Sequence, residues 1–321
     1  MPVYTVKVPA EYNKAERLDK YIASLPDGMN RSKLKSGVTE ILLNGKKSKL
    51  SQKINGGDVI DITWEDNIPD YIEPEDIPLD IIYEDENVTV VNKKQGMVTH
   101  PACGNWNGTL VNALLYHWGR ESIKQIKEGS EQKILEFRRP GIVHRLDKET
   151  SGIIITAKNR DTEEFLGDQF RNKKLRKEYI LIVKGRPPEK AGDIRTQIIR
   201  DPKDRKRFKA VTDTNEGKYA RTIYHCISSY GNYTLVRVRL KTGRTHQIRV
   251  HMKFLGCPIV GDSIYNKVDP IFPDATLMLH SKLLQIQLPG QENPKTFITG
   301  TPERFIELEK KLKKMYNKKE L

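Results

Sequence analysis

The 321-residue sequence contains few cysteines and no long apolar run. Its three cysteines, Cys103, Cys226 and Cys257, lie far apart and form no Cys-x-x-Cys pair, which excludes a disulfide framework as the organising principle. No stretch of about 18 consecutive apolar residues is present, so no membrane span is predicted. The first residues also lack the apolar core of a signal peptide. We therefore expect a protein of the reducing cytoplasm without a membrane partner. We also expect it to act as a monomer.

Acidic residues are outnumbered by basic ones. The chain has 56 Lys and Arg residues against 42 Asp and Glu residues, which gives a formal net charge of +14. An excess of this size bears on partners rather than on fold, and polyanions such as RNA or DNA are the leading candidates. The alternative is a protein that is merely soluble and basic, and the distribution of the charge decides between the two.

The first 64 residues have the pattern of a small α/β unit. Leu18, Ile22 and Leu25 are spaced as one face of a helix. A strand then enters the tight turn expected at Asn44-Gly45, and the alternating residues 58–62 predict a closing strand. We expect residues 1–64 to form a separate domain.

Basic residues are concentrated in this unit. Between positions 31 and 53, seven basic residues are opposed by Glu40 alone, a local charge of +6. These residues are Arg31, Lys33, Lys35, Lys46, Lys47, Lys49 and Lys53. A surface of one sign suits the phosphates of RNA, and we expect contacts from the first five residues of this set. A solvated lysine-rich face is the alternative.

Residues 65–80 mark a boundary. They include seven acids and three prolines but no Lys or Arg, so the segment is expected to be extended and to stay off RNA. We assign it as a linker, and we assign residues 81–321 to a second domain. Residues 120–139 are polar without periodicity and are expected to form a surface excursion.

The most informative stretch of the second domain is residues 144–152. It is flanked by apolar runs at 141–143 and 152–157, which predict buried strands. His144, Arg145 and Asp147 fall within four residues, on the kind of loop that often carries catalytic groups. A solvated hairpin turn is one alternative. A kinase catalytic loop is excluded because Leu146 separates Arg145 from Asp147 and no Asp-Phe-Gly follows.

A second polar segment follows the strand predicted at 233–240. Ile248, Met252 and Leu255 have helical spacing, so a helix is expected to begin near Thr245 as N-cap and to end at Gly256. Its positive end lies next to Arg244, a corner that suits a phosphate or a carboxylate. His246 and His251 are five residues apart and do not match the two-histidine zinc helix.

Shorter features complete the pattern. Lys177-Glu178-Tyr179 leads into an apolar strand, and Tyr179 alone would be an ordinary strand residue. Residues 200–209 carry six basic residues against two acids, with Phe208 among them. From residue 310 the chain carries six lysines and one acid. Both basic segments are candidate RNA contacts or solvated surfaces.

Three of these segments resemble the motifs of one enzyme family, the RluA-type pseudouridine synthases. Residues 144–152 closely resemble the family signature in which Asp is catalytic, residues 242–251 resemble a second motif, and residues 177–179 a third. The N-terminal unit is similar to the ribosomal-protein-type RNA-binding module of many members. The chain departs from the family pattern at Lys94, where proline is usual, and at Ser281, where alanine is usual.

The resemblance implies an α+β fold with a mixed, largely antiparallel sheet and a central RNA cleft. It implies isomerisation of uridine in large-subunit ribosomal RNA, without metal or cofactor. Asp147 would then be the catalytic carboxylate, Arg244 its ion-pair partner, and Tyr179 the aromatic that stacks on uracil and handles a proton. Arg145 would fill the space that the flipped base leaves, and His144 would also contact RNA.

Two other function classes are weighed against this one. A non-catalytic RNA-binding assembly factor on the same scaffold is disfavoured because Asp147, Tyr179 and Arg244 are all present. A deaminase-like or hydrolytic enzyme is disfavoured by the lack of a His/Cys zinc signature.

Overall fold

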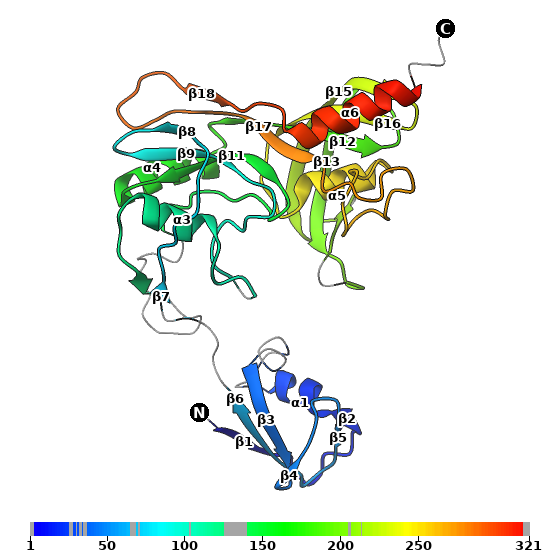
Figure 1. Ribbon diagram of the computed structural model, residues 1–321. Coiled ribbons are helices and arrows are strands. Elements are labelled where there is room, and N and C mark those ends of the chain that lie inside the picture. Colours follow the sequence, from blue (N-terminus) through cyan, green and yellow to red (C-terminus); the bar gives the residue numbers. More distant parts are fainter. Residues whose placement is uncertain are drawn as a thin grey trace. The chain divides into compact units, whose positions relative to one another are not determined.

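The protein is described here by a computed structural model, drawn in Figure 1. The structure describes residues 3–25, 28–29, 31, 34, 37–64, 69, 71–102, 104–124, 140–204, 207–212 and 214–316. Contacts along the chain divide it into two compact units, Met1–Asp70 and Tyr71–Leu321.

In the described part of the first unit, helix α1 and a short strand pair pack with a four-stranded sheet. Its described elements are β1 (Val3–Lys7), β2 (Glu16–Arg17), α1 (Leu18–Ser24), β3 (Val38–Leu43), β4 (Lys46–Lys47), β5 (Lys53–Ile54) and β6 (Val59–Trp64). The sheet runs in the order β1-β6-β3-β4, all antiparallel. Leu18 and Ile22 of α1 are fully buried with Ile60 and Ile62 of β6, as the helical spacing predicts.

The Asn-Gly turn is found where the sequence predicts it. Asn44 and Gly45, between β3 and β4, have positive φ angles of 52° and 74°. Two successive positive φ angles are what a two-residue hairpin turn of this kind requires.

The second unit is built on one large sheet. Its described strands are β7 (Tyr71–Ile72), β8 (Ile81–Glu84), β9 (Val88–Lys93), β10 (Ile123–Lys124), β11 (Ser151–Ala157), β12 (Arg176–Lys184), β13 (Ala191–Arg200), β14 (Phe208–Val211), β15 (Lys218–Tyr230), β16 (Tyr233–Leu240), β17 (Leu279–Ile286) and β18 (Lys295–Ile298). The main sheet has the order β14-β13-β15-β16-β12-β17-β11-β9-β8, with β18 on β17. Only β11 and β17 pair in parallel within the described sheet, so the predicted α+β fold with a largely antiparallel sheet is confirmed.

Helices cover this sheet on both halves. The described helices are α3 (Leu110–His117), α4 (Arg160–Arg171), α5 (Gln247–Phe254) and α6 (Glu303–Tyr316). Figure 1 shows α3 and α4 beside the half that carries β8, β9 and β11, and α5 and α6 beside the half that carries β12 to β16. All seven residues of β11 are buried, as the unbroken apolar run indicates.

Three local expectations differ from the structure. Residues 141–143 form no strand, since only Ile142 makes an isolated bridge, to Thr156. Helix α5 begins at Gln247 with His246 as N-cap, one residue later than the expected N-cap, Thr245. Residues 71–80, expected within the linker, belong to the second unit, where Tyr71–Ile72 pair with Ile123–Lys124. In addition, none of the helices in the described residues is long and apolar enough to cross a membrane.

Gly152 provides a test of the parallel β11–β17 pair. Its φ is +110°, and an added Cβ would lie 2.2 Å from the carbonyl oxygen of Ser281 on β17. We expect Gly152→Ala to lower the free energy of unfolding by about 3 kcal/mol or more, from backbone strain and overpacking together. Gly290→Ala is the control, because Gly290 has a φ of +71° and nothing within 4 Å of an added Cβ. Its loss should stay near 1 kcal/mol. Equal shifts of the urea midpoint in both variants would contradict the close-approach argument.

Candidate active site

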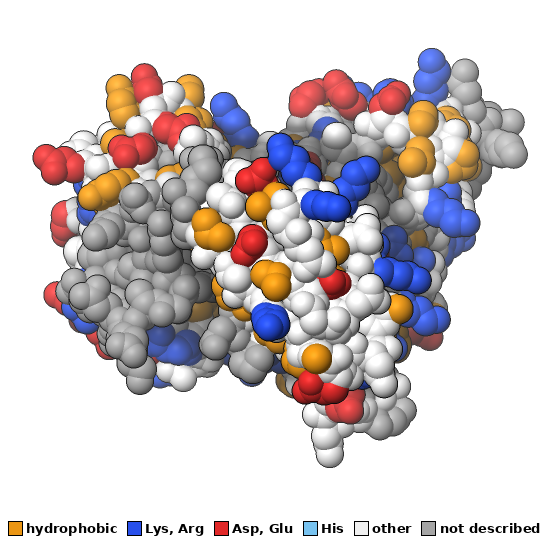
Figure 2. Space-filling view, turned by 90° about the horizontal axis from the view of Figure 1, so that it is seen from below, with side chains coloured by type: hydrophobic (Ala, Val, Ile, Leu, Met, Phe, Trp, Pro, Cys, Tyr) orange, Lys and Arg blue, Asp and Glu red, His pale blue; other side chains and the backbone are white. Residues whose placement is uncertain are grey.

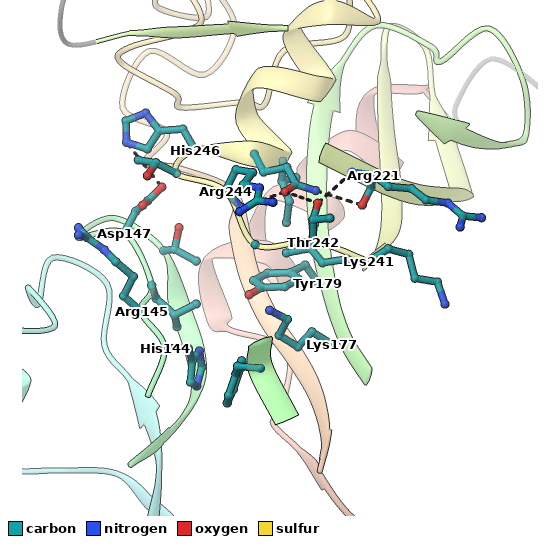
Figure 3. A pocket seen from close by; sticks show the side chains of 18 of the residues that line it. His144, Arg145, Asp147, Lys177, Tyr179, Arg221, Lys241, Thr242, Arg244 and His246 are labelled. Atoms are coloured by element: carbon teal, nitrogen blue, oxygen red, sulfur yellow. Dashed lines mark hydrogen bonds and ion pairs between the residues drawn. The ribbon is translucent and has the colours of Figure 1, made fainter. Parts of the chain in front are cut away.

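The site is a pocket of about 740 Å³ in the second unit. Most of its lining comes from three segments that are distant in sequence: residues 143–147, the stretch from Phe170 to Tyr179, and residues 239–249. Thr150, Tyr219, Arg221 and Leu279 complete the lining. Figure 3 shows Asp147, Tyr179, Lys177, Arg244 and His246 around it. The volume is that of a site for a small molecule or a single nucleotide.

The sheet brings these segments together. Strand β17 lies between β11 and β12, and its Ser281 pairs with Gly152 on one side and Tyr179 on the other. The loop that carries Asp147 enters β11 directly. Two strand spacings of about 4.8 Å therefore separate that strand from the one carrying Tyr179.

The Asp147 loop is anchored through its backbone. The carbonyl of Leu146 accepts a hydrogen bond from Thr99 Oγ1 at 2.9 Å, and the carbonyl of Lys148 accepts one from the backbone of Gly96 at 2.9 Å. Lys93, only 1% exposed, directs its ammonium to the carbonyls of Lys94, Met97 and Lys148 at 3.0, 2.7 and 3.3 Å. Residues 93–99 therefore bind the backbone carbonyls on both sides of Asp147. These hydrogen bonds fix the position of the Asp147 backbone, from which its side chain extends into the pocket.

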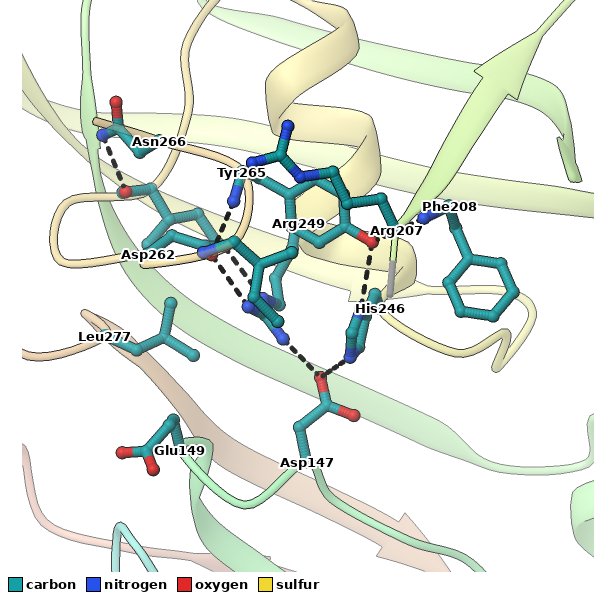
Figure 4. Close-up of polar contacts among 12 residues, drawn as sticks. Asp147, Glu149, Arg207, Phe208, His246, Arg249, Asp262, Tyr265, Asn266 and Leu277 are labelled. Atoms are coloured by element: carbon teal, nitrogen blue, oxygen red, sulfur yellow. Dashed lines mark hydrogen bonds and ion pairs between the residues drawn. The ribbon is translucent and has the colours of Figure 1, made fainter. Parts of the chain in front are cut away.

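Arg249 is the ion-pair partner of Asp147, as Figure 4 shows. Its Nη1 lies 3.4 Å from Oδ2 of Asp147, while Nε and Nη2 bind both oxygens of Asp262 at 2.8 Å. Asp262 is fully buried and also accepts the backbone N–H groups of Ile264 and Tyr265. Burial raises the pKa of Asp262, but the Arg249 guanidinium outweighs this effect and holds the pKa below its ordinary value.

The predicted pair of Asp147 with Arg244 is therefore wrong. Arg244 is exposed on the pocket wall, and its Nε donates to the carbonyl of Tyr219 at 2.9 Å. The physical reason is the turn before α5, which Gln247 fixes: its side chain accepts from Thr242 Oγ1 and Arg244 N, and donates to Thr222 Oγ1. This arrangement directs the first turn of the helix, with Arg249, toward Asp147.

His246 connects this cluster to strand β14. Its Nδ1 lies 2.9 Å from the hydroxyl of Tyr265, and that hydroxyl accepts the backbone N–H of Phe208 at 2.9 Å. The other ring nitrogen, Nε2, is 3.8 Å from Oδ2 of Asp147. Burial lowers the pKa of His246, against the opposing effect of Asp147, so the neutral ring is favoured. A neutral His246 with its proton on Nε2 would present that proton to the carboxylate.

Tyr179 is a buried phenol, 6% exposed, on the pocket wall. Burial raises its pKa to about 12, while the hydrogen bond with Ser281 acts in the opposite direction. The hydroxyl therefore keeps its proton at neutral pH. It is placed to pack against a ring and to donate a hydrogen bond, and it would need assistance to act as a base.

His144 and Arg145 lie on the pocket in different ways. The His144 ring stacks on Phe170 with centroids 4.5 Å apart, and its Nε2 accepts the backbone N–H of Ile155 at 3.1 Å. Burial lowers the pKa of His144 to about 3, so it is a fixed neutral wall of the pocket. Arg145 is exposed, and Figure 3 shows it beside Asp147.

The other predicted site residues belong to the first unit. Arg31 donates to the buried Asp19 at 2.6 and 3.0 Å, so much of its charge neutralises that carboxylate. Lys46 and Lys47 are exposed on β4, and Lys47 lies 3.6 Å from Glu40. Lys33 and Lys35 lie outside the described residues.

Four residues of the site were not anticipated from the sequence. They are Lys93, Lys177, Arg249 and Asp262. Arg249 lies inside the segment 242–251, but spacing alone does not tell which of its two arginines faces Asp147. Lys177 precedes Tyr179 by two residues on a predicted strand, and that spacing was a usable sign that both share a face.

Comparison with known proteins identifies related sequences. Residues 87–254 match the family described as RNA pseudouridylate synthase. The chain is 43% identical to ribosomal large subunit pseudouridine synthase D of Borreliella burgdorferi, over 94% of this chain and 92% of that protein. It is 38% identical to an uncharacterized RNA pseudouridine synthase of Bacillus subtilis, over 95% of this chain and 97% of that protein.

A solved structure shares the fold. The structure of human RNA pseudouridylate synthase domain containing 4 superposes with a TM-score of 0.54 at 24% identity. It covers 73% of this chain and 92% of its own.

The Arg249–Asp262 pair can be tested by removing one charge. Asp262→Asn leaves a buried guanidinium with weaker partners, and we expect it to lower the free energy of unfolding by about 3 kcal/mol or more. Asp193→Asn is the matched control, because Asp193 pairs with Arg195 and Arg221 where the side chains are 30–60% exposed. That change should stay below about 1 kcal/mol. Urea unfolding at pH 7 measures the free energy of unfolding of both variants. Equal decreases would show that the buried Arg249–Asp262 pair contributes no more to stability than the exposed ion pairs of Asp193.

Proposed function

The chain belongs to the RNA pseudouridylate synthase family, and from this we propose that it converts specific uridines of large-subunit ribosomal RNA into pseudouridine. The enzyme is an isomerase. The relative from Borreliella burgdorferi, which carries the large ribosomal subunit in its name, supports this choice of RNA. The observation that carries the proposal is the Asp147 carboxylate, fixed by Arg249 at the wall of a pocket of nucleotide size.

Isomerisation breaks the bond between ribose carbon 1′ and uracil nitrogen 1, turns the uracil, and joins carbon 5 to carbon 1′. We assign Asp147 as the carboxylate that acts on the ribose, either by attack on carbon 1′ or by removal of the carbon 2′ proton. Arg249 orients it for both routes, because the guanidinium is itself held by Asp262. The neutral phenol of Tyr179 is assigned to pack on the uracil and to donate a hydrogen bond to it.

The target uridine must leave its stack before it enters the pocket, at a cost of a few kcal/mol. Arg145, exposed beside Asp147, is assigned to the space that the flipped base leaves. Arg171, Lys173 and Arg244, all exposed on the pocket lining, suit the phosphates of the strand that enters it. These residues make the pocket the centre of the proposed RNA cleft.

We propose that the first unit binds RNA next to the target. Lys46 and Lys47 are exposed on β4, and the basic residues of segment 31–53 exceed its acid by six charges. Lys and Arg side chains, in blue, are among those visible on the face that Figure 2 shows from below. Cations of this density increase RNA affinity by counterion release, independently of sequence.

We propose that the enzyme acts as a monomer in the cytoplasm. The three widely spaced cysteines suit a reducing compartment, and Cys226 and Cys257 are unpaired.

The first experiment measures tritium release from ribosomal RNA labelled at carbon 5 of uridine. We expect the wild type to release tritium and Asp147→Asn to lose at least 10³-fold in rate, since an amide cannot replace the reacting carboxylate. Asp274→Asn, which changes an exposed aspartate outside the pocket lining, should keep the wild-type rate. Equal release by wild type and Asp147→Asn would remove Asp147 from its role. No release by wild type on free RNA and on precursor subunits would overturn the proposed function.

The role of the first unit is tested by the salt dependence of RNA binding. We expect the double variant Lys46→Gln/Lys47→Gln to weaken binding and to reduce the slope of log Kd against log salt by about 2, or about 1 per lysine. Lys253→Gln/Lys267→Gln removes the same charge from exposed positions of the second unit and should leave the slope nearly unchanged. Titrations between low and moderate salt measure both slopes. If the two double variants behave alike, β4 makes no phosphate contact.

A further inference from the structure

Lys177 lies in the pocket without an assigned task. It is two residues before Tyr179 on β12, so both side chains point to the same face of the sheet. It lines the pocket, and its ammonium lies 5.2 Å from the centre of the Phe170 ring. Figure 3 shows Lys177 next to Tyr179 and His144.

The ammonium has no oxygen partner in the described part of the chain. No hydrogen bond or ion pair joins it to a described carbonyl or carboxylate, and Phe170 is its nearest cation–π contact there. The contrast is Lys93, whose ammonium is bound by three carbonyls. A partly buried cation without such partners is less favourable than a solvated one unless a ligand supplies the negative charge. Consistent with this, burial lowers the pKa of Lys177 to about 8.

Gly243 keeps the space beside this ammonium open. A Cβ on Gly243 would meet only the Nζ of Lys177, at 3.4 Å, and no other atom within 4 Å. The backbone at Gly243 does not have the positive φ that would require glycine. Gly243, which precedes Arg244, therefore leaves space in the pocket next to the Lys177 ammonium.

The proposed reaction generates a negative charge in this pocket. When the bond from carbon 1′ to nitrogen 1 breaks, its electron pair stays on uracil and spreads to oxygens 2 and 4. A half-turn of the ring about the axis through nitrogen 3 and carbon 6 exchanges nitrogen 1 with carbon 5, and oxygen 2 with oxygen 4. A cation fixed at one carbonyl position therefore faces a carbonyl oxygen before and after the turn.

We propose that Lys177 is a further catalytic residue, whose ammonium binds a carbonyl oxygen of the target uracil and stabilises the free uracil anion while it turns. This inference rests on the proposed function. Lys177 stays protonated throughout. The electron pair left on uracil forms the new bond from carbon 5 to carbon 1′. The carbon 5 proton then leaves to a separate base or to solvent, and nitrogen 1 takes up one proton from solvent, which restores the neutral ring. The exposed cations of the rim, Arg171, Lys173 and Arg244, are better placed for phosphates, because Lys177 is flanked by the rings of Phe170 and His144.

The test compares single-turnover rate with RNA affinity. We expect Lys177→Met to lower the rate constant of pseudouridine formation at saturating enzyme by about 10²-fold or more, as for the loss of an oxyanion-stabilising donor. Its Kd for RNA should stay within about threefold of wild type. Lys177→Arg keeps the charge and should retain most of the rate. Lys253→Met, on the exposed side of α5, is the matched control and should change neither quantity.

The pH dependence provides a readout that a structural role would not move. The protonated ammonium is the active form, so the wild-type rate should fall as pH rises through about 8. Lys177→Arg should hold its rate to higher pH, because a guanidinium stays charged.

The outcomes separate the explanations. Weaker RNA binding by Lys177→Met with an unchanged rate constant would make Lys177 a phosphate contact and overturn the inference, as would no change in either quantity. If Lys177→Met does not fold, the pH profiles decide, and identical alkaline limbs in wild type and Lys177→Arg overturn it. A wild type that forms no pseudouridine overturns the proposed function itself, and this control is measured first.

Discussion

Arg249 is held between two carboxylates, the fully buried Asp262 behind it and the partly exposed Asp147 in front. Removing a guanidinium and a carboxylate from water is unfavourable unless the geometry compensates. Here two parallel hydrogen bonds of 2.8 Å join the pair, and two backbone N–H groups complete the coordination of Asp262. The Arg249–Asp262 pair is therefore held rigidly. The remaining guanidinium nitrogen, Nη1, contacts Asp147 and orients its carboxylate.

The sheet supplies the second constraint. The Asp147 loop reaches the site because β11 runs parallel to β17 through the contact of Gly152 with Ser281, which no residue with a Cβ would allow. On the other side Ser281 pairs with Tyr179. The carboxylate, the phenol and Lys177 thus take their positions from three neighbouring strands, and the 93–99 segment locks the loop from behind. Rigid positioning of this kind is a main contribution that a protein makes to the reaction in its active site.

The charged side chains of the molecule differ in burial and in partners. Buried charges such as Asp19, Asp262 and Lys93 are matched by ion pairs or by carbonyls. The exposed cations of the pocket rim and of β4 are in contact with solvent, where they suit phosphates. Lys177 belongs to neither class, since it is partly buried and has no oxygen partner among the described residues. An unmatched charge inside a reaction pocket is physically informative because proteins rarely leave one without a use.

The family, the type of fold and the position of Asp147 can be predicted from the amino-acid sequence, since continuous motifs, apolar runs and the Asn44-Gly45 turn depend on local chemistry. Strand β16 has the expected boundaries, and β12 contains residues 177–179 as expected, for the same reason. The choice of the arginine that meets Asp147 depends on the three-dimensional fold. Arg244 and Arg249 share one segment, and the choice depends on the side chain of Gln247 and on Asp262, thirteen residues beyond Arg249. The three-dimensional fold also decides that His144 is a fixed wall and that Arg31 binds Asp19, because burial and pairing across the fold leave no periodic trace in the chain.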